Sequence, residues 1–147
     1  MKLLNVELSD QIKGLFDAQL IFPVELLYFS NHEACDTCDE ADQLFEEIAS
    51  LSDKIKVNKF DIQKNQGIAQ KYNVQLTPGL VIAGGGEIEP VDYGIRFAGI
   101  PSGHEFGSLI QAIILVSKRD SGLKPALRKQ LKELKKPVYL QVFVTPT

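Results

Sequence analysis

The sequence predicts an α/β fold in which a central, mixed four-stranded sheet is flanked by helices. Three observations lead to this prediction. The 147 residues, 44% of them hydrophobic, suffice for one globular domain with an appendage. Short runs of strand type occur between stretches with apolar residues at helical spacing. The last two strand-type runs are separated by the glycine-rich turn at 84–87, which indicates a hairpin.

The first part of the chain predicts a helix, a buried strand and a second helix. Segment 9–20 starts with Ser9, a residue type that caps helix N-termini, and repeats apolar residues at helical spacing. The apolar run at 23–30 has the length and composition of a buried strand. From 38 to 51 the apolar residues fall on one face, which indicates an amphipathic helix.

The remainder of the domain predicts further alternation that ends in a hairpin and a helix. Ser102 and Glu105 have the spacing of a capping box, which indicates that the last helix begins there. The order strand-helix-strand, then hairpin and helix, is typical of a thioredoxin-like arrangement. The segments are a strand at 55–62, a short helix at 64–73, strands at 76–83 and 91–100, and a helix within 101–118.

Both cysteines of the chain, Cys35 and Cys38, lie where the first core strand is expected to end and its helix to begin. A cysteine at a helix N-terminus feels the positive end of the helix dipole, which favours its thiolate. A cysteine three positions on lies on the same face of the first turn, within reach of the first sulfur. We therefore expect Cys35 to attack a substrate disulfide and Cys38 to resolve the mixed disulfide.

Two other uses of the cysteine pair are weighed against this one. A structural disulfide is less expected than a catalytic or metal-binding pair if the chain is cytoplasmic. A closed zinc site needs four ligands, whereas the chain adds only His32 and His104, which are far apart in sequence. We therefore expect no metal site, although a CxxC pair alone is a moderate signal and needs corroboration.

The charges around the pair bear on its redox potential. Between Glu33 and Glu47 the sequence has seven carboxylates and no lysine or arginine. Carboxylates a few ångström away oppose a thiolate, and the helix terminus offsets only part of this effect. We expect a less acidic thiol and a more reducing couple than in strongly oxidising proteins. A protonated His32 would act in the opposite direction.

Thr77 and Pro78 corroborate the redox interpretation. They directly precede the apolar strand run GLVIA, as expected of the substrate-binding turn in a thioredoxin-like arrangement. There the proline is typically cis and lies against the dithiol, which leaves the preceding backbone free to pair with an extended substrate. Alone, a proline at this point would equally suit a plain edge or turn.

Several segments together resemble a known family. They are PVELLYFS (23–30), the CxxC pair, TPGLVI (77–82) and above all YGIRFAGIPSGHEFGSLI (93–110). They resemble the N-terminal half of the protein disulfide oxidoreductases, glutaredoxin-like proteins with two thioredoxin-like units. This resemblance covers nearly the whole chain and implies cytosolic disulfide chemistry. The N-terminal module of the alkyl hydroperoxide reductase flavoprotein has a similar segment, but that relative has lost the cysteines present here.

The C-terminal part resembles the beginning of a second unit. KPVYLQVFV (136–144) repeats FPVELLYFS (22–30), with Pro, Val, Leu and Phe in register. We expect a thioredoxin-like redox unit at 1–120, a linker helix at 121–136 and, at 137–147, the first strand of a truncated second unit. An apolar strand without its sheet has to pair with an edge of its own domain or of a neighbouring chain. We therefore predict self-association through 137–147.

These observations predict a cytoplasmic thiol-disulfide oxidoreductase without a cofactor. The first residues lack the apolar stretch of a signal peptide, no run approaches the roughly 18 apolar residues of a membrane span, and the net charge of -3 gives no reason to expect nucleic acid. Reduction or exchange of protein disulfides is the favoured activity, with a thioredoxin-reductase-like electron donor. One alternative is electron transfer to a peroxiredoxin. Another is a non-catalytic platform for docking or dimerisation.

Overall fold

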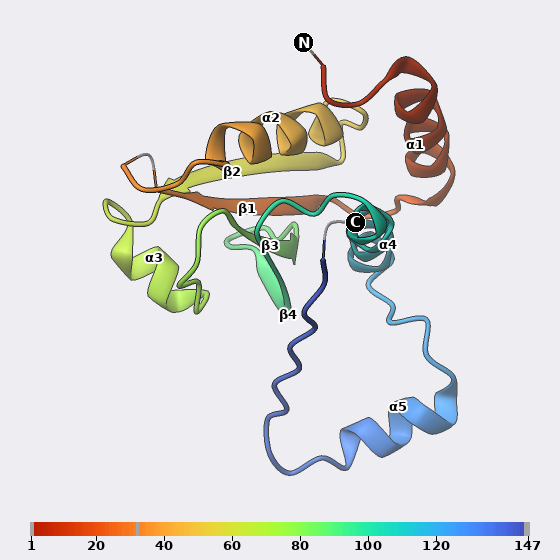
Figure 1. The fold of residues 1–147 in the computed structure, drawn as a ribbon. Coiled ribbons are helices and arrows are strands. Elements are labelled where there is room, and N and C mark those ends of the chain that lie inside the picture. The colour runs from red at the N-terminus through yellow and green to blue at the C-terminus, as the bar shows by residue number, and fades with distance from the viewer. Residues whose placement is uncertain (1, 32, 146–147) are drawn as a thin grey trace.

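The expected α/β architecture is confirmed by the computed structural model, which describes residues 2–31 and 33–145. A four-stranded mixed sheet with the order β2-β1-β3-β4 forms its centre (Figure 1). None of the helices in the described part is both long and apolar enough to cross a membrane. The elements are α1 (Val6–Gln19), β1 (Val24–Ser30), α2 (Cys38–Ala49), β2 (Ile55–Asp61), α3 (Gln66–Lys71), β3 (Gly79–Gly84), β4 (Val91–Ala98), α4 (His104–Lys118) and α5 (Pro125–Lys132).

The strand that leads to the cysteines is an inner strand of the sheet. β1 pairs with β2 in parallel and with β3 in antiparallel orientation, and β3 pairs with β4 in antiparallel orientation. Both edges of β1 are therefore hydrogen-bonded, and its run Leu26–Phe29 is buried on both faces of the sheet. This burial explains why the strand has a continuous apolar run instead of an alternating pattern.

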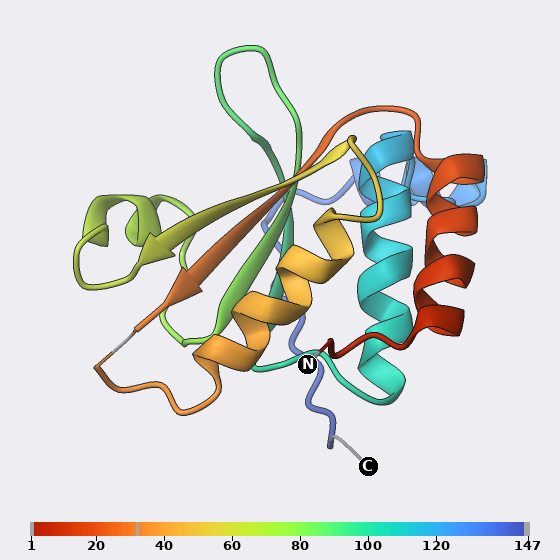
Figure 2. The ribbon, with the colours of Figure 1, turned by 90° about the horizontal axis from the view of Figure 1, so that it is seen from above.

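Helices cover both faces of this sheet. α2 and α4 lie on one face, with α1 packed beside α4, and α3 lies on the other (Figure 2). The side chains of β1 alternate between these layers because successive residues of a strand point to opposite faces. Leu26 and Tyr28 pack in the larger core with α2 and α4, whereas Leu27 and Phe29 pack in the smaller core with α3.

The cap of the first helix lies four residues earlier than expected, so the predicted cap at Ser9 is wrong. Asn5 caps α1, and its side-chain oxygen accepts a hydrogen bond from the Leu8 N–H at 2.8 Å. The N–H of Ser9 is already bonded to the carbonyl of Asn5 at 3.0 Å. Ser9 is therefore a residue of the first turn.

The predicted capping box at Ser102 and Glu105 is also wrong. α4 begins at His104, its N-cap is Gly103 with φ of 58°, and no side chain caps it. A positive φ of this size favours glycine, so the chain enters the helix through a turn that only Gly103 adopts easily. The contact between Ser102 and Glu105 is a backbone hydrogen bond of 3.2 Å from the Glu105 N–H.

The C-terminal part lies outside the domain core. α5 is shorter than the linker helix expected at 121–136, and none of its residues is buried. Residues 137–145 form no strand, and Phe143 is 89% exposed. The predicted strand is thus not formed within the described part of this chain, because a strand requires a neighbour to bond with. Pairing with a neighbouring chain stays a prediction.

Candidate redox site

The predicted site residues come together at one end of the sheet. The cysteines follow β1, and the Thr77-Pro78 turn precedes β3, which runs antiparallel to β1. Phe29 pairs with Gly79, so the end of β1 and the turn are adjacent. Figure 1 and Figure 2 both place the start of β3 beside the N-terminus of α2. The fold therefore brings the cysteines and the Thr77-Pro78 turn together although they are far apart in sequence, as expected of a thioredoxin-like arrangement.

Cys35 and Cys38 form a disulfide, with a distance of 5.5 Å between their Cα atoms. Cys38 is the first residue of α2 and is only 1% exposed, whereas Cys35 lies in the preceding loop and is half-buried. Cys35 is therefore the more accessible residue of the pair. Thr37 is the N-cap of α2 but provides no side-chain hydrogen bond to the helix.

Tyr28 contacts this site from the sheet, and sequence reasoning missed it. Its hydroxyl donates a hydrogen bond of 2.7 Å to the carbonyl of Cys38, and its ring packs edge-on against Phe45 at 5.3 Å. Burial raises the pKa of Tyr28 well above its usual value, and the nearby charges of Asp42 and Asp39 raise it further. The hydroxyl therefore stays protonated and keeps its role as a donor.

The seven carboxylates near the cysteines have three kinds of surroundings. Lys59 of β2 binds Asp42 at 2.9 Å and Glu46 at 2.7 Å, which the local charge count did not anticipate. Glu47 accepts hydrogen bonds from backbone N–H groups near the N-terminus. Burial acts to raise the pKa of Glu47, but these hydrogen bonds, first that of the Leu4 N–H, outweigh it and lower the pKa. The remaining four are exposed and form no ion pair with a lysine or arginine in the described residues: Glu33, Asp36, Asp39 and Glu40.

The Thr77-Pro78 turn has the expected cis peptide bond. Pro78 is buried, Thr77 is half-buried, and Leu76 just before them is 67% exposed. The carbonyl of Pro78 accepts a hydrogen bond of 2.8 Å from the N–H of Gly99, which follows β4. This end of the turn is thereby attached to the loop between β4 and α4.

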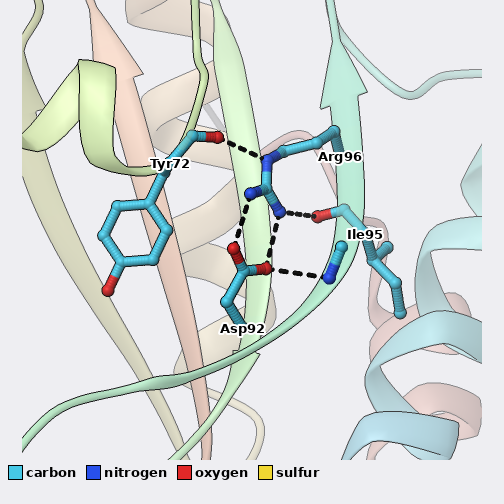
Figure 3. Close-up of polar contacts among 5 residues, drawn as sticks. Tyr72, Asp92, Ile95 and Arg96 are labelled. Atoms are coloured by element: carbon cyan, nitrogen blue, oxygen red, sulfur yellow. Dashed lines mark hydrogen bonds and ion pairs between the residues drawn. The ribbon is translucent and has the colours of Figure 1, made fainter. Parts of the chain in front are cut away.

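Arg96 of β4 binds the start of the segment that leads from α3 to this turn, and sequence reasoning did not single it out (Figure 3). Its Nε donates to the carbonyl of Tyr72 at 2.8 Å, while its two terminal nitrogens bind the Asp92 carboxylate at 2.8 and 2.7 Å. A bulge makes this possible, because Gly94 adopts φ of 82° between Asp92 and Arg96. The Arg96 hydrogen bond, aided by the Gly94 N–H and opposed by burial, lowers the pKa of Asp92.

The sequence also suggested the two histidines as possible metal ligands. His32 lies outside the described residues, and His104 is the first residue of α4. Within the described part of the chain, no three side chains of His, Cys, Asp or Glu are grouped so that they would hold a metal ion.

Fold and site together define a class of protein: a thioredoxin fold with a CxxC redox pair at the N-terminus of its first core helix after β1. The chain belongs to the thioredoxin domain family, whose profile matches residues 30–111. That range begins at the end of β1 and includes both cysteines, the Thr77-Pro78 turn and part of α4.

Curated relatives are similar to this chain over nearly its whole length. The alkyl hydroperoxide reductase AhpF of Staphylococcus epidermidis strain ATCC 12228 is 30% identical over 145 residues, which are 99% of this chain and 25% of that protein. The chain thus spans about a quarter of the length of the curated relatives it matches.

Solved structures show the same fold. The NTD_N/C domain of the alkylhydroperoxide reductase AhpF from Enterococcus faecalis superimposes with a TM-score of 0.79 at 28% identity, covering 90% of this chain and 62% of that one. A protein disulfide oxidoreductase from Aeropyrum pernix has a TM-score of 0.77 at 23% identity, covering 89% of this chain and 55% of that one. The second likeness concerns the fold alone. Family, fold and the CxxC pair together support a thiol-disulfide oxidoreductase.

Proposed function

We propose that this unit reduces or exchanges protein disulfides with Cys35 as the nucleophile and Cys38 as the resolving cysteine. The observation that carries the proposal is the unequal exposure of the pair: Cys35 is half-buried, whereas Cys38 is 1% exposed. A bulky disulfide substrate reaches the first sulfur and not the second. The position of the pair at the start of α2 supports the same roles, because the helix terminus stabilises a thiolate there.

The exchange takes place in two balanced steps. The Cys35 thiolate attacks one sulfur of the substrate disulfide, which forms a mixed disulfide and releases the other substrate sulfur as a thiolate. The Cys38 thiolate then attacks the sulfur of Cys35, forms the Cys35–Cys38 disulfide and releases the second substrate thiolate. The pair loses two electrons and the substrate gains them. The two protons of the dithiol end on the two substrate thiols.

Thr77 and Pro78 serve in this proposal as the substrate-binding turn. The turn lies beside the N-terminus of α2, and its backbone is attached at Tyr72 and Pro78. The exposed Leu76 gives it an apolar contact next to the point where the substrate chain would lie. An extended segment that carries the substrate disulfide is the form of substrate that such a turn fits.

Trapping separates the two cysteine roles. Cys38→Ser, incubated with an excess of oxidised glutathione, should gain one glutathione on Cys35, measured by intact mass and peptide mapping. Cys35→Ser should react at least about tenfold more slowly, because the sulfur of Cys38 is buried. Equal rates for the two variants would contradict the assigned roles. A wild-type pair that fails to cycle in a dithiothreitol redox titration would refute the oxidoreductase function itself.

Electron transfer to a peroxiredoxin is the second candidate. Its support is the likeness to the alkyl hydroperoxide reductase AhpF over nearly the whole chain. In this version the reduced pair donates its two electrons to the disulfide of the peroxiredoxin instead of a general protein disulfide. Turnover of a peroxiredoxin with hydroperoxide and this chain in the reduced form, compared with Cys35→Ser as control, distinguishes the two candidates.

Self-association through 137–147 and a cytoplasmic location complete the proposal. The support for association is the exposed apolar run that follows α5, with Leu140 84% and Phe143 89% exposed. In the platform alternative this contact is the function and the dithiol is idle. Light scattering of the whole chain and of a deletion of 137–147 tests the contact: a monomer in both cases would remove it. Cell fractionation tests the location.

A further inference from the structure

A disulfide and hydrogen bonds connect the start of α2 to the rest of the domain. In the oxidised state the disulfide ties Cys38 to the preceding loop. The backbone adds the first helical hydrogen bond, from the Ala41 N–H to the Thr37 carbonyl at 3.0 Å, but the Thr37 side chain does not cap the helix. The hydrogen bond from the Tyr28 hydroxyl to the Cys38 carbonyl, at 2.7 Å, connects this turn to the sheet.

We propose that Tyr28 is a positioning residue that holds the resolving cysteine in place while the disulfide is open. The inference rests on the proposed function, because it concerns the step in which Cys38 attacks the sulfur of Cys35. When the disulfide opens, the covalent connection to Cys38 is lost. The hydrogen bond from Tyr28 involves only a side-chain hydroxyl and a backbone carbonyl, so its atoms are the same in both redox states.

Tyr28 itself is held firmly in the sheet. Tyr28 lies in the middle of β1, where its backbone pairs with Lys59 of β2 on one edge and Leu80 of β3 on the other. Its ring is 2% exposed and is fixed edge-on by Phe45 of α2. The two contacts of Tyr28 with α2 therefore lie almost two turns apart, and together they set both the position and the direction of the first turns of that helix.

This position matters for resolution of the mixed disulfide. An intramolecular attack is fast when the attacking atom is already close and aligned, and it slows as its position spreads. If the first turn of α2 frays while the disulfide is open, the Cys38 sulfur occupies more positions. Closing the disulfide then costs more conformational entropy. Loss of the Tyr28 hydroxyl should therefore lower both the rate and the equilibrium constant of ring closure.

The test replaces Tyr28 with phenylalanine, which keeps the ring and removes the hydroxyl. The equilibrium constant for disulfide formation against glutathione should fall about two- to tenfold, the range that one net hydrogen bond accounts for. A tenfold fall corresponds to a potential about 30 mV less reducing. The lifetime of the mixed disulfide, followed by rapid quench and mass spectrometry, should lengthen by a similar factor.

Two control variants separate positioning from stability. Ser117→Ala removes the hydroxyl of a buried residue of α4, which donates to the carbonyl of Phe22 at 2.6 Å just before the start of β1, away from the cysteines. This variant should leave the equilibrium constant unchanged. Phe45→Leu keeps the Tyr28 hydroxyl but removes the ring contact. Expressed as free energies, its effect on stability to urea should be larger than its effect on the equilibrium constant for disulfide formation. Amide exchange at Cys38 to Ala41 should accelerate in the reduced form of Tyr28→Phe.

The outcomes are distinguishable. A wild-type couple that cycles normally, with Tyr28→Phe indistinguishable from it in both equilibrium constant and mixed-disulfide lifetime, overturns this inference alone. A wild-type pair that does not cycle overturns the proposed function and this inference with it. A fall in the equilibrium constant of equal size in Tyr28→Phe and Ser117→Ala would also overturn the inference, because the effect would then follow the loss of any buried hydroxyl.

Discussion

Replacing Arg96 with glutamine should lower the free energy of unfolding by about 1.5–3 kcal/mol. The arginine donates to the carbonyl of Tyr72 and makes two bonds with Asp92. A hydrogen bond to a charged group contributes about 1.5–3 kcal/mol when it is well buried. The Arg96 and Asp92 side chains are 28% and 34% exposed, so screening by water reduces the ion pair to about 1 kcal/mol or less. The bond to Tyr72 supplies most of the remainder.

The chain contains a matched control for this change. Lys13 and Asp17 also form an ion pair at the i,i+4 spacing, but their side chains are 56% and 62% exposed and the contact is 3.5 Å long. Lys13→Gln should lower the free energy of unfolding by no more than about 0.5 kcal/mol. Urea unfolding of both variants and the wild type in the oxidised form, followed by far-UV circular dichroism, measures the difference. Equal losses for the two variants would refute the argument.

The loss caused by Arg96→Gln should also depend on pH. The hydrogen bond from Arg96 holds the pKa of Asp92 below its ordinary value of 3.8. A carboxyl group whose folded pKa is depressed contributes stability above its unfolded pKa and loses it as the pH falls through the folded pKa. The difference between wild type and Arg96→Gln should thus be complete at neutral pH and shrink below about pH 4. A difference that grows on acidification would contradict the assigned ion pair.

Two further predictions concern backbone positions and helix caps. Gly79→Ala should lower stability by about 1–3 kcal/mol and slow disulfide exchange, because the new Cβ would lie 2.6 Å from the carbonyl oxygen of Leu76 beside the substrate-binding turn. Gly14→Ala, in α1 with open space around the new methyl group, should instead gain about 0.5–1 kcal/mol with unchanged exchange kinetics. Asn5→Ala should lower stability by about 0.5–2 kcal/mol, whereas Ser9→Ala should be nearly neutral; the reverse order in urea unfolding would restore Ser9 as the cap.

Local patterns predicted the architecture because the decisive signals are short. The continuous apolar run of β1 marks an inner strand, and the cysteines that follow it mark the start of α2. The turn at Thr77 and Pro78 was recognisable because proline before an apolar strand is a local feature. Its place beside the cysteines was expected from the thioredoxin-like arrangement, and in the structure Phe29 at the end of β1 pairs with Gly79 after the turn.

The choice between possible caps depended on tertiary contacts that no local pattern contains. Asn5 and Ser9 are both suitable N-caps, and the chain uses Asn5 because Leu4 is buried and its N–H donates to Glu47 of α2 at 2.8 Å. These contacts set the point at which the chain enters the helix. Similarly, Gly103 replaces Ser102 as the cap of α4 through a backbone turn that is invisible in a side-chain pattern.

The residues that sequence reasoning missed act across the fold. Tyr28 of β1 bonds to Cys38 of α2, and Arg96, which lies beside a bulge in β4, bonds to Tyr72 at the C-terminal end of α3. Both look like ordinary core or surface residues in a one-dimensional pattern. The segment 137–144 shows the opposite problem: its apolar residues suit a strand, but the strand forms only where another strand provides hydrogen bonds.

Four exposed carboxylates near the cysteines form no ion pair in the described part of the chain. Their negative charge should also influence which partner proteins bind at the redox site. Any partner that brings its sulfur to Cys35 has to place its own surface within one Debye length, about 8 Å at physiological salt, of this acidic rim. We therefore expect partners with lysine or arginine beside their cysteine to be attracted and acidic ones to be repelled, so that charge favours some partners before any sulfur reacts. Exchange with a basic partner should slow as salt is added, and exchange with an acidic partner should accelerate.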